Sequence, residues 1–214
     1  MGLSMYLWEL ATDQRKGFFD AWMAAILWLL ALVYSGIVRF LAFWYGIRPF
    51  RAGCRVLSVG NITVGGTGKT PLTEWLSRYL LSQGKHIAVL SRGYAGGDEP
   101  QMLAAKLPQV PVLVHSDRVH SVKQAMQLYG VDAVILDDGL QQWRIAKDLN
   151  IVMIGSSQGF GNRCLLPRGI LREPLSALRR ADIFVVHNPD QQPVAPVLLE
   201  TLRRLNAKAE IVHT

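Results

Sequence analysis

The hydrophobic and polar positions divide the chain into two parts with different patterns. Residues 21–38 form an uncharged run of 18 residues, AWMAAILWLLALVYSGIV, and beyond Arg39 the segment continues apolar to Ile47. After that segment, short apolar runs alternate with stretches in which apolar residues recur at helical spacing. We therefore expect an N-terminal apolar helical segment over residues 1–50 and an α/β domain over residues 51–214.

The second part predicts a mainly parallel β-sheet flanked by helices. Its apolar runs are continuous rather than alternating with polar residues, which is typical of strands buried on both faces. Helical patterns lie between the runs, and one of them extends from a cap at Ser116 to Tyr129. Another is centred near residues 175–180, and a last one covers residues 196–206. The expected strands cover residues 55–59, 86–90, 110–114, 133–136, 149–154 and 183–186, with a last strand starting at Glu210.

The apolar run in the first part is long enough to cross a bilayer. A helix of 18 residues extends over roughly 27 Å, and a hydrocarbon core is about 30 Å thick. Aromatic residues of the kind found at membrane interfaces lie within and around it, and they favour a membrane-associated helix over a buried core helix. More basic residues follow the run than precede it, which places the second part in the cytoplasm. The aromatic residues are Trp22, Trp28, Trp44 and Tyr45; the basic residues are Arg15 and Lys16 before the run and Arg39, Arg48, Arg51 and Arg55 after it. A spanning helix and a half-embedded helix both fit this pattern.

Composition and charge narrow the possible functions. Hydrophobic residues make up 50% of the chain and charged residues 18%, so an ordered core is expected. The formal net charge is +7, which favours an anionic partner. The basic residues are scattered and no nucleic-acid-binding motif occurs, so we expect no nucleic-acid partner. The chain has two cysteines and no CxxC spacing, so we expect neither a disulfide framework nor a structural zinc site.

A glycine-rich loop stands where the first strand is followed by a helix. Glycines at this place let backbone N–H groups surround phosphate oxygens, and the helix N-terminus adds its positive end. The lysine of such a loop reaches the β- and γ-phosphates, and the next hydroxyl holds Mg²⁺. The pattern differs from GxxxxGK[ST] at its first position, where the chain has Thr63. The expected nucleotide-binding residues are Gly65, Gly66, Thr67, Gly68, Lys69 and Thr70.

Two acids complete this constellation. The apolar strand at residues 133–136 runs directly into Asp137 and Asp138. A carboxylate at such a strand end lies beside the phosphate-binding loop and orients Mg²⁺. We therefore expect Thr70, Asp137 and Asp138 at a magnesium site, and Mg²⁺ and ATP as cofactors.

Other polar residues follow other strands. Asp98 comes after the second strand and is a candidate to position or deprotonate an attacking hydroxyl, although a solvated turn acid fits the pattern equally well. Arg118 and Arg172 are candidates for binding an anionic substrate group, because guanidinium groups suit phosphate. For Arg163 and Arg168 we expect ordinary surface arginines.

Six motifs together resemble the tetraacyldisaccharide 4'-kinase family, the lipid A kinases of Gram-negative bacteria. In order along the chain, after the apolar helix, they read SVGNITVGGTGKTP, SRGY with GDEP, SDRV, DDGLQ, GFGN and LREPLSALRRAD. They cover nearly the whole chain.

The resemblance implies a P-loop kinase-like α/β fold and transfer of the ATP γ-phosphate to the 4'-hydroxyl of a lipid disaccharide 1-phosphate. The reaction is expected at the cytoplasmic face of the bacterial inner membrane, by a monomer. Lys69, Asp138 and Asp98 match catalytic positions, with Asp98 in GDEP at the place of the family's proposed base. Further active-site positions are matched by Glu99, Arg118, Gln141, Arg172 and Glu173.

The chain also departs from the family pattern. Gln142 stands where the family usually has His, and Arg168 and Ile170 replace a small residue and a proline. Family members continue well beyond the last residue here, into a second lobe with a His that pairs with the catalytic Asp. We therefore expect nucleotide binding to be intact and transfer to be weak. The alternative is a non-catalytic membrane-associated P-loop nucleotide-binding protein or an inactive truncated homologue.

Overall fold

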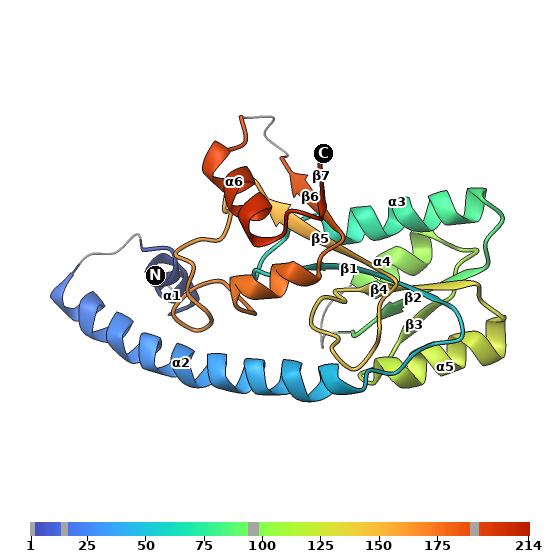
Figure 1. Ribbon diagram of the computed structural model, residues 1–214, viewed down its shortest axis with the longest axis horizontal. Coiled ribbons are helices and arrows are strands. Elements are labelled where there is room, and N and C mark those ends of the chain that lie inside the picture. The colour runs from blue at the N-terminus through green and yellow to red at the C-terminus, as the bar shows by residue number, and fades with distance from the viewer. Residues whose placement is uncertain (1–2, 14–16, 94–98, 189–192) are drawn as a thin grey trace.

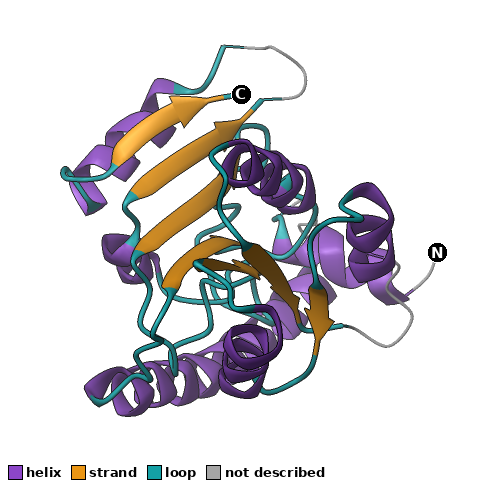
Figure 2. Ribbon diagram, turned by 90° about the vertical axis from the view of Figure 1, so that its right-hand side faces the viewer, coloured by secondary structure: helices purple, strands orange, loops and turns teal. Residues whose placement is uncertain are grey.

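Seven parallel strands form a single sheet in the order β3-β2-β4-β1-β5-β6-β7. The computed structural model describes residues 3–13, 17–93, 99–188 and 193–214. Figure 2 shows the strands side by side with helices on both sides. The strands are β1 (Arg55–Asn61), β2 (Ile87–Ser91), β3 (Val112–Val114), β4 (Ala133–Asp137), β5 (Leu149–Gly155), β6 (Ile183–His187) and β7 (Glu210–His213). The helices are α1 (Leu3–Ala11), α2 (Phe18–Ile47), α3 (Lys69–Ser82), α4 (Glu99–Lys106), α5 (Arg118–Tyr129), the 3₁₀ helix η1 (Leu175–Arg180) and α6 (Pro196–Leu205).

Both faces of the sheet are apolar, as expected from the continuous apolar runs. Side chains alternate along each strand, so Val59 and Ile135 face one side while Val56 and Val134 face the other. The first side packs against α3 and α4, and the second against α5, η1 and α6. Burial on both faces explains why most residues of the strands are apolar instead of alternating with polar ones. The expectation of a mainly parallel sheet flanked by helices is confirmed.

Parallel pairing brings the ends of β1 and β4 together at one edge of the sheet. Val59 of β1 lies in register with Asp137 of β4. The phosphate-binding loop follows β1, and the acid pair ends β4. The topology therefore places the two parts of the predicted nucleotide site side by side at the carboxyl ends of the strands, where ligands bind in open α/β sheets.

Helix α2 runs along one side of the molecule and contacts it through a single face (Figure 1). Leu27, Ala31 and Val38 are buried, and Tyr34 is half-buried on the same face. The spacing of four, three and four residues is that of one helical face. It is the only helix in the described part of the chain that is long and apolar enough to cross a membrane, and 17% of its most apolar 18-residue window is buried. Most of its apolar surface therefore faces outward.

Local details differ from the sequence-based expectations at several elements. The cap of α5 is Asp117 and not Ser116: the Asp117 side chain accepts a hydrogen bond from the Val119 amide at 2.9 Å. The segment near residues 175–180 is a 3₁₀ helix and not an α-helix. Two short helices, α1 and α4, were not expected, because their 9 and 8 residues are too few for an apolar period to stand out.

Candidate nucleotide-binding site

The loop between β1 and α3 wraps the N-terminus of α3. Gly68 caps the helix in the left-handed conformation, with φ of 78°, and Lys69 is the first helical residue. A Cβ at Gly68 would also lie 3.3 Å from the side chains of His187 and Met153. Glycine is therefore required at this position on two counts. The arrangement aims the helix N-terminus into the space that the loop encloses.

The unusual Thr63 is explained by its pairing. Thr63 forms an antiparallel bridge with Leu171, and the neighbouring Val64 amide donates to the Ile170 carbonyl at 2.8 Å. The buried Asn61 side chain also donates to the Thr63 carbonyl at 2.7 Å. The loop therefore enters in an extended form stabilised by residues 170–171, and this form does not need glycine.

The two acids, Asp137 and Asp138, lie in different environments. Asp137 is buried, and its carboxylate accepts a hydrogen bond from the Thr73 hydroxyl at 3.3 Å. Burial, reinforced by the neighbouring negative charge of Asp138, raises the pKa of the Asp137 carboxyl to about 6. Asp138 adopts the left-handed conformation with φ of 56°, which is uncommon for a residue with a side chain. Such conformations concentrate at functional sites, where the surroundings stabilise them.

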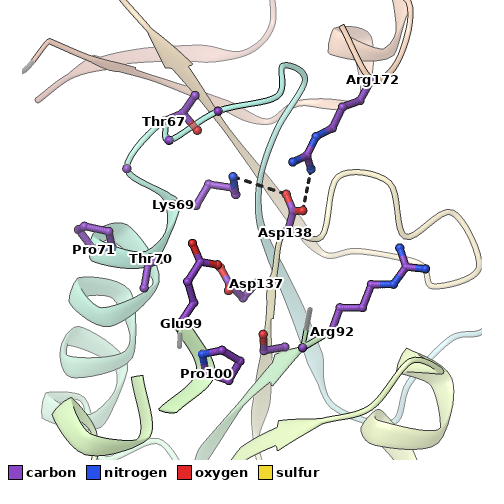
Figure 3. Close-up of a pocket in the computed structure, with 15 residues that line it drawn as sticks. Thr67, Lys69, Thr70, Pro71, Arg92, Glu99, Pro100, Asp137, Asp138 and Arg172 are labelled. Atoms are coloured by element: carbon purple, nitrogen blue, oxygen red, sulfur yellow. Dashed lines mark hydrogen bonds and ion pairs between the residues drawn. The ribbon is translucent and has the colours of Figure 1, made fainter. Parts of the chain in front are cut away.

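Two cations flank the Asp138 carboxylate. Its Oδ1 lies 3.8 Å from the Nζ of Lys69, and its Oδ2 accepts a hydrogen bond from Arg172 at 2.7 Å. Figure 3 shows the Lys69 and Arg172 side chains both reaching Asp138, Lys69 from the left and Arg172 from above. All three side chains are largely buried, with exposed fractions between 14% and 22%. A phosphate group entering here meets two positive groups in a partly dehydrated setting, where charge-assisted hydrogen bonds are strong.

These side chains border a cavity of about 500 Å³. Its walls come from the phosphate-binding loop, the end of β2, the start of α4 and the acid pair (Figure 3). The predicted residues on this cavity are Gly65, Gly66, Thr67, Gly68, Lys69, Thr70, Glu99, Asp137, Asp138 and Arg172, joined by Ser91, Arg92, Gly93, Pro71 and Pro100.

The donor set fits a magnesium ion shared with phosphates. Within the described residues, no three His, Cys, Asp or Glu side chains gather into a metal-binding group. Mg²⁺ does not need such a group, because it retains waters and binds one or two carboxylates together with phosphate oxygens. Asp137, Asp138 and the Thr70 hydroxyl border the same cavity and supply oxygen ligands of that kind.

A second, smaller cavity adjoins the first. It has a volume of about 290 Å³ and shares Arg92, Asp138 and Arg172 with the larger one. Its other walls are Tyr34 of α2 with Gln141, Gln142 and Leu166. The shared side chains therefore separate a space at the phosphate-binding loop from a space beside the apolar helix.

The sequence model of the family described as "Tetraacyldisaccharide-1-P 4'-kinase" matches residues 23–96 and 95–213. The chain belongs to this kinase family.

Curated relatives agree with that assignment. The tetraacyldisaccharide 4'-kinase of Syntrophotalea carbinolica is 41% identical over 187 residues, covering 76% of this chain and 52% of the relative. That of Syntrophus aciditrophicus is 44% identical over 181 residues, covering 72% of this chain and 48% of the relative. The chain therefore spans about half the length of the curated kinases it matches.

Solved structures show the same fold. The structure of LpxK from Aquifex aeolicus in complex with ATP superposes with a TM-score of 0.69 and 32% identity, covering 77% of this chain and 58% of that one. The hydrogenase maturation factor HypB from Archaeoglobus fulgidus superposes with a TM-score of 0.52 at 12% identity, which shows the fold alone. The P-loop NTPase-like architecture expected from the sequence is confirmed.

Three further residues that were expected at the site lie away from the larger cavity. Arg118 is 2% exposed, and its guanidinium donates to the His115 carbonyl at 3.1 Å, so it is enclosed at the start of α5. Glu173 is 1% exposed and accepts hydrogen bonds from Gln141, Trp143 and Arg180 at 3.2, 3.1 and 2.6 Å. Gln141 borders the smaller cavity and also donates to the Asn61 carbonyl. Asp98 lies outside the described residues.

The two arginines expected at the surface differ. Arg163 is exposed, as expected. For Arg168 the expectation is wrong: its guanidinium donates to the Leu10 carbonyl at 2.9 Å and pairs with Asp13, and only 16% of the side chain is exposed. Arg168 thus attaches the N-terminal helix α1 to the body. No local pattern around Arg168 indicates this role, because its partners lie 155 and 158 positions away.

Arg92 and Tyr34 are among the cavity residues that the sequence analysis missed. Arg92 borders both cavities, and its place directly after β2 is a signal that was available, since polar residues at strand ends form α/β sites. Tyr34 borders the smaller cavity from within the apolar helix. Nothing in the apolar run distinguishes it from the other aromatic residues there.

Proposed function

We propose that this chain binds Mg²⁺ and ATP and provides the nucleotide site for transfer of the γ-phosphate to the 4'-hydroxyl of tetraacyldisaccharide 1-phosphate. The observation that carries the proposal is the convergence of Lys69 and Arg172 on Asp138 at the mouth of a glycine-rich loop. Phosphoryl transfer needs mainly positioning and neutralisation of charge, and this cluster offers both.

Each group has a distinct part in the proposal. The loop amides and Lys69 bind the β- and γ-phosphates, and Arg172 neutralises charge on the terminal phosphate. Thr70, Asp137 and Asp138 would hold Mg²⁺, which would neutralise part of the negative charge of the phosphates. Asp98, by its place in the family motif, orients or deprotonates the attacking hydroxyl.

The smaller cavity beside α2 is the proposed entry for the acceptor. It is lined by arginine, glutamine and tyrosine side chains that suit a phosphorylated sugar, and it opens next to an outward-facing apolar helix. We infer that residues 1–50 associate with the cytoplasmic face of the bacterial inner membrane, where the lipid acceptor resides, and that residues 51–214 carry the nucleotide chemistry. Arg118 and Glu173 then support the site from within the body instead of touching the acceptor.

The test is an ATP-binding measurement with Mg²⁺ on wild-type, Lys69→Ala and Lys85→Ala chains. Lys85 is exposed beyond the far end of α3 and serves as the matched control. We expect Lys69→Ala to weaken ATP binding by at least tenfold and Lys85→Ala to leave it unchanged. Phosphate transfer to the lipid disaccharide 1-phosphate is then measured with Asp98→Asn, which should retain ATP binding and lose transfer. Equal ATP affinity in the two lysine variants contradicts the nucleotide site, and unchanged transfer by Asp98→Asn contradicts the assignment of the base.

A further inference from the structure

A single hydroxyl group connects helix α2 to the charged cluster. The Tyr34 side chain lies on the inward face of α2, and its hydroxyl donates a hydrogen bond to the Arg172 carbonyl at 3.0 Å, across 138 positions of sequence. Arg172 in turn donates to Asp138, which lies beside Lys69. A continuous path therefore leads from the apolar helix to the phosphate-binding loop.

The bond from Tyr34 is one of two that hold the backbone of Arg172. The Arg172 amide donates to the Ile62 carbonyl at 2.8 Å, and its carbonyl accepts from Tyr34 on the other side. The guanidinium lies at the end of a long side chain that has many rotamers. A fixed backbone therefore limits the positions that the guanidinium can reach. Fixing both peptide groups of Arg172 sets the origin from which the guanidinium reaches Asp138.

Tyr34 borders the smaller of the two cavities and binds a residue that borders both. Tyr34, Arg172 and Asp138 border the same 290 Å³ cavity, while Arg172 and Asp138 also border the larger one. A change in how α2 is seated on the body therefore acts on the backbone of Arg172 through this bond.

We propose that Tyr34 is a positioning residue for phosphoryl transfer: its hydroxyl sets the location of Arg172, and it thereby couples the seating of α2 to the ATP site. The inference rests on the proposed function, because it takes ATP as the ligand. It assigns to the apolar helix a part in the chemistry beyond holding the protein at a lipid surface.

The experiment measures ATP and ADP affinity with Mg²⁺ for the full chain carrying Tyr34→Phe. Phenylalanine keeps the ring and removes only the hydroxyl. Because one hydrogen bond is lost, we expect ATP affinity to fall about two- to tenfold. ADP affinity should fall less, because Arg172 is proposed to neutralise the terminal phosphate of ATP, which ADP lacks. Tyr45→Phe is the matched control: it lies on the same helix, and its recorded contact with Arg144 uses the ring, which phenylalanine retains.

A double-mutant cycle separates positioning from a merely structural role. Arg172→Ala keeps the carbonyl that Tyr34 binds and removes the guanidinium. If Tyr34 acts through that guanidinium, Tyr34→Phe has no further effect on ATP affinity in the Arg172→Ala background, although it lowers the melting temperature similarly in both backgrounds.

Two results would overturn the inference alone: an unchanged preference for ATP over ADP in Tyr34→Phe, or an equal loss of ATP affinity with and without the Arg172 guanidinium. A wild-type chain that binds no ATP overturns the proposed function, and this inference with it.

Discussion

The Arg172 guanidinium donates a 2.7 Å hydrogen bond to the Asp138 carboxylate, although 34 positions separate the two residues in the chain. The exposed fractions of the two side chains are 22% and 16%, so water screens the pair only weakly. Asp138 has a left-handed backbone conformation and also lies beside Lys69. A strained acid between two cations is a preorganised place for a phosphate and its metal ion.

Replacing Arg172 with lysine is expected to weaken ATP binding about tenfold, because lysine keeps the charge and loses the planar set of donors. The measurement is ATP affinity with Mg²⁺ by calorimetry. Arg180→Lys is the matched control, since Arg180 also pairs with a carboxylate, that of Glu173, but does not border the larger cavity. Similar losses in both variants would show that the larger cavity is not the ATP site.

Asp137→Asn is expected to stabilise the metal-free protein at pH 7–8 and to change its stability little below pH 4. The folded-state pKa of Asp137 is raised to about 6 from its ordinary value near 4, so the folded protein binds the extra proton between these values. Stability of the wild type therefore falls as pH rises through this window, and asparagine removes that fall. At pH 7.5 the substitution is expected to raise the free energy of unfolding by about 3 kcal/mol. Urea unfolding of both proteins at pH 4 and pH 7.5, in the presence of a chelator, measures their free energies of unfolding. If the variant differed from the wild type by the same amount at both pH values, the raised pKa of the buried Asp137 carboxyl would be contradicted.

Much of the fold follows from local patterns. Continuous apolar runs identify buried parallel strands, since each of them must present apolar side chains to both faces. The loop at residues 65–70 and the acids that end β4 were also predictable, because parallel strands bring their carboxyl ends to one edge. The structure of the strands, of this loop and of the acid pair depends on residues that are near each other in sequence, or on the general geometry of a parallel sheet.

The remainder depends on partners far along the chain. Arg118 and Arg172 both stand in motifs that suggest anion binding, yet one is enclosed beside His115 and the other points into the cavity. Glu173 follows Arg172 directly, yet its buried side chain does not border the cavity and accepts three hydrogen bonds within the body. Residue type and spacing do not distinguish these cases, because the difference is set by tertiary packing.

Arg168→Ala is expected to release α1 from the body. The arginine binds the Leu10 carbonyl and Asp13, and Leu10 itself is 3% exposed, so loss of the arginine leaves a buried carbonyl without its charged donor. We expect amide hydrogen exchange in residues 3–11 to accelerate by at least tenfold while exchange in β1 and β4 stays unchanged. Arg163→Ala in the same loop is the control, because Arg163 is exposed. Unchanged exchange in α1 would mean that apolar packing alone holds it.

Charges on the outward face of α2 are expected to abolish membrane binding without unfolding the protein. Leu29 and Val33 are 59% and 62% exposed, on the side of α2 away from its buried face. If a lipid surface covers them, each contributes roughly 1.5–3 kcal/mol, so the pair Leu29→Glu with Val33→Glu should lower vesicle partitioning by at least about 100-fold. Leu128→Glu on α5 is the matched control, since Leu128 is 65% exposed and belongs to the globular body.

Point substitutions test this better than deletion of residues 1–50. Deletion also removes Leu27, Ala31 and Val38, which are buried against the body, as well as the Tyr34 hydroxyl that binds Arg172. Loss of membrane binding after deletion therefore mixes two effects, whereas the outward-facing glutamates change only the surface presented to lipid. The measurement is co-sedimentation with vesicles containing anionic phospholipid, with the melting temperature of each variant recorded in parallel. A wild-type chain that stays in the supernatant, or a double variant that still sediments, would show that something other than lipid covers this face of α2.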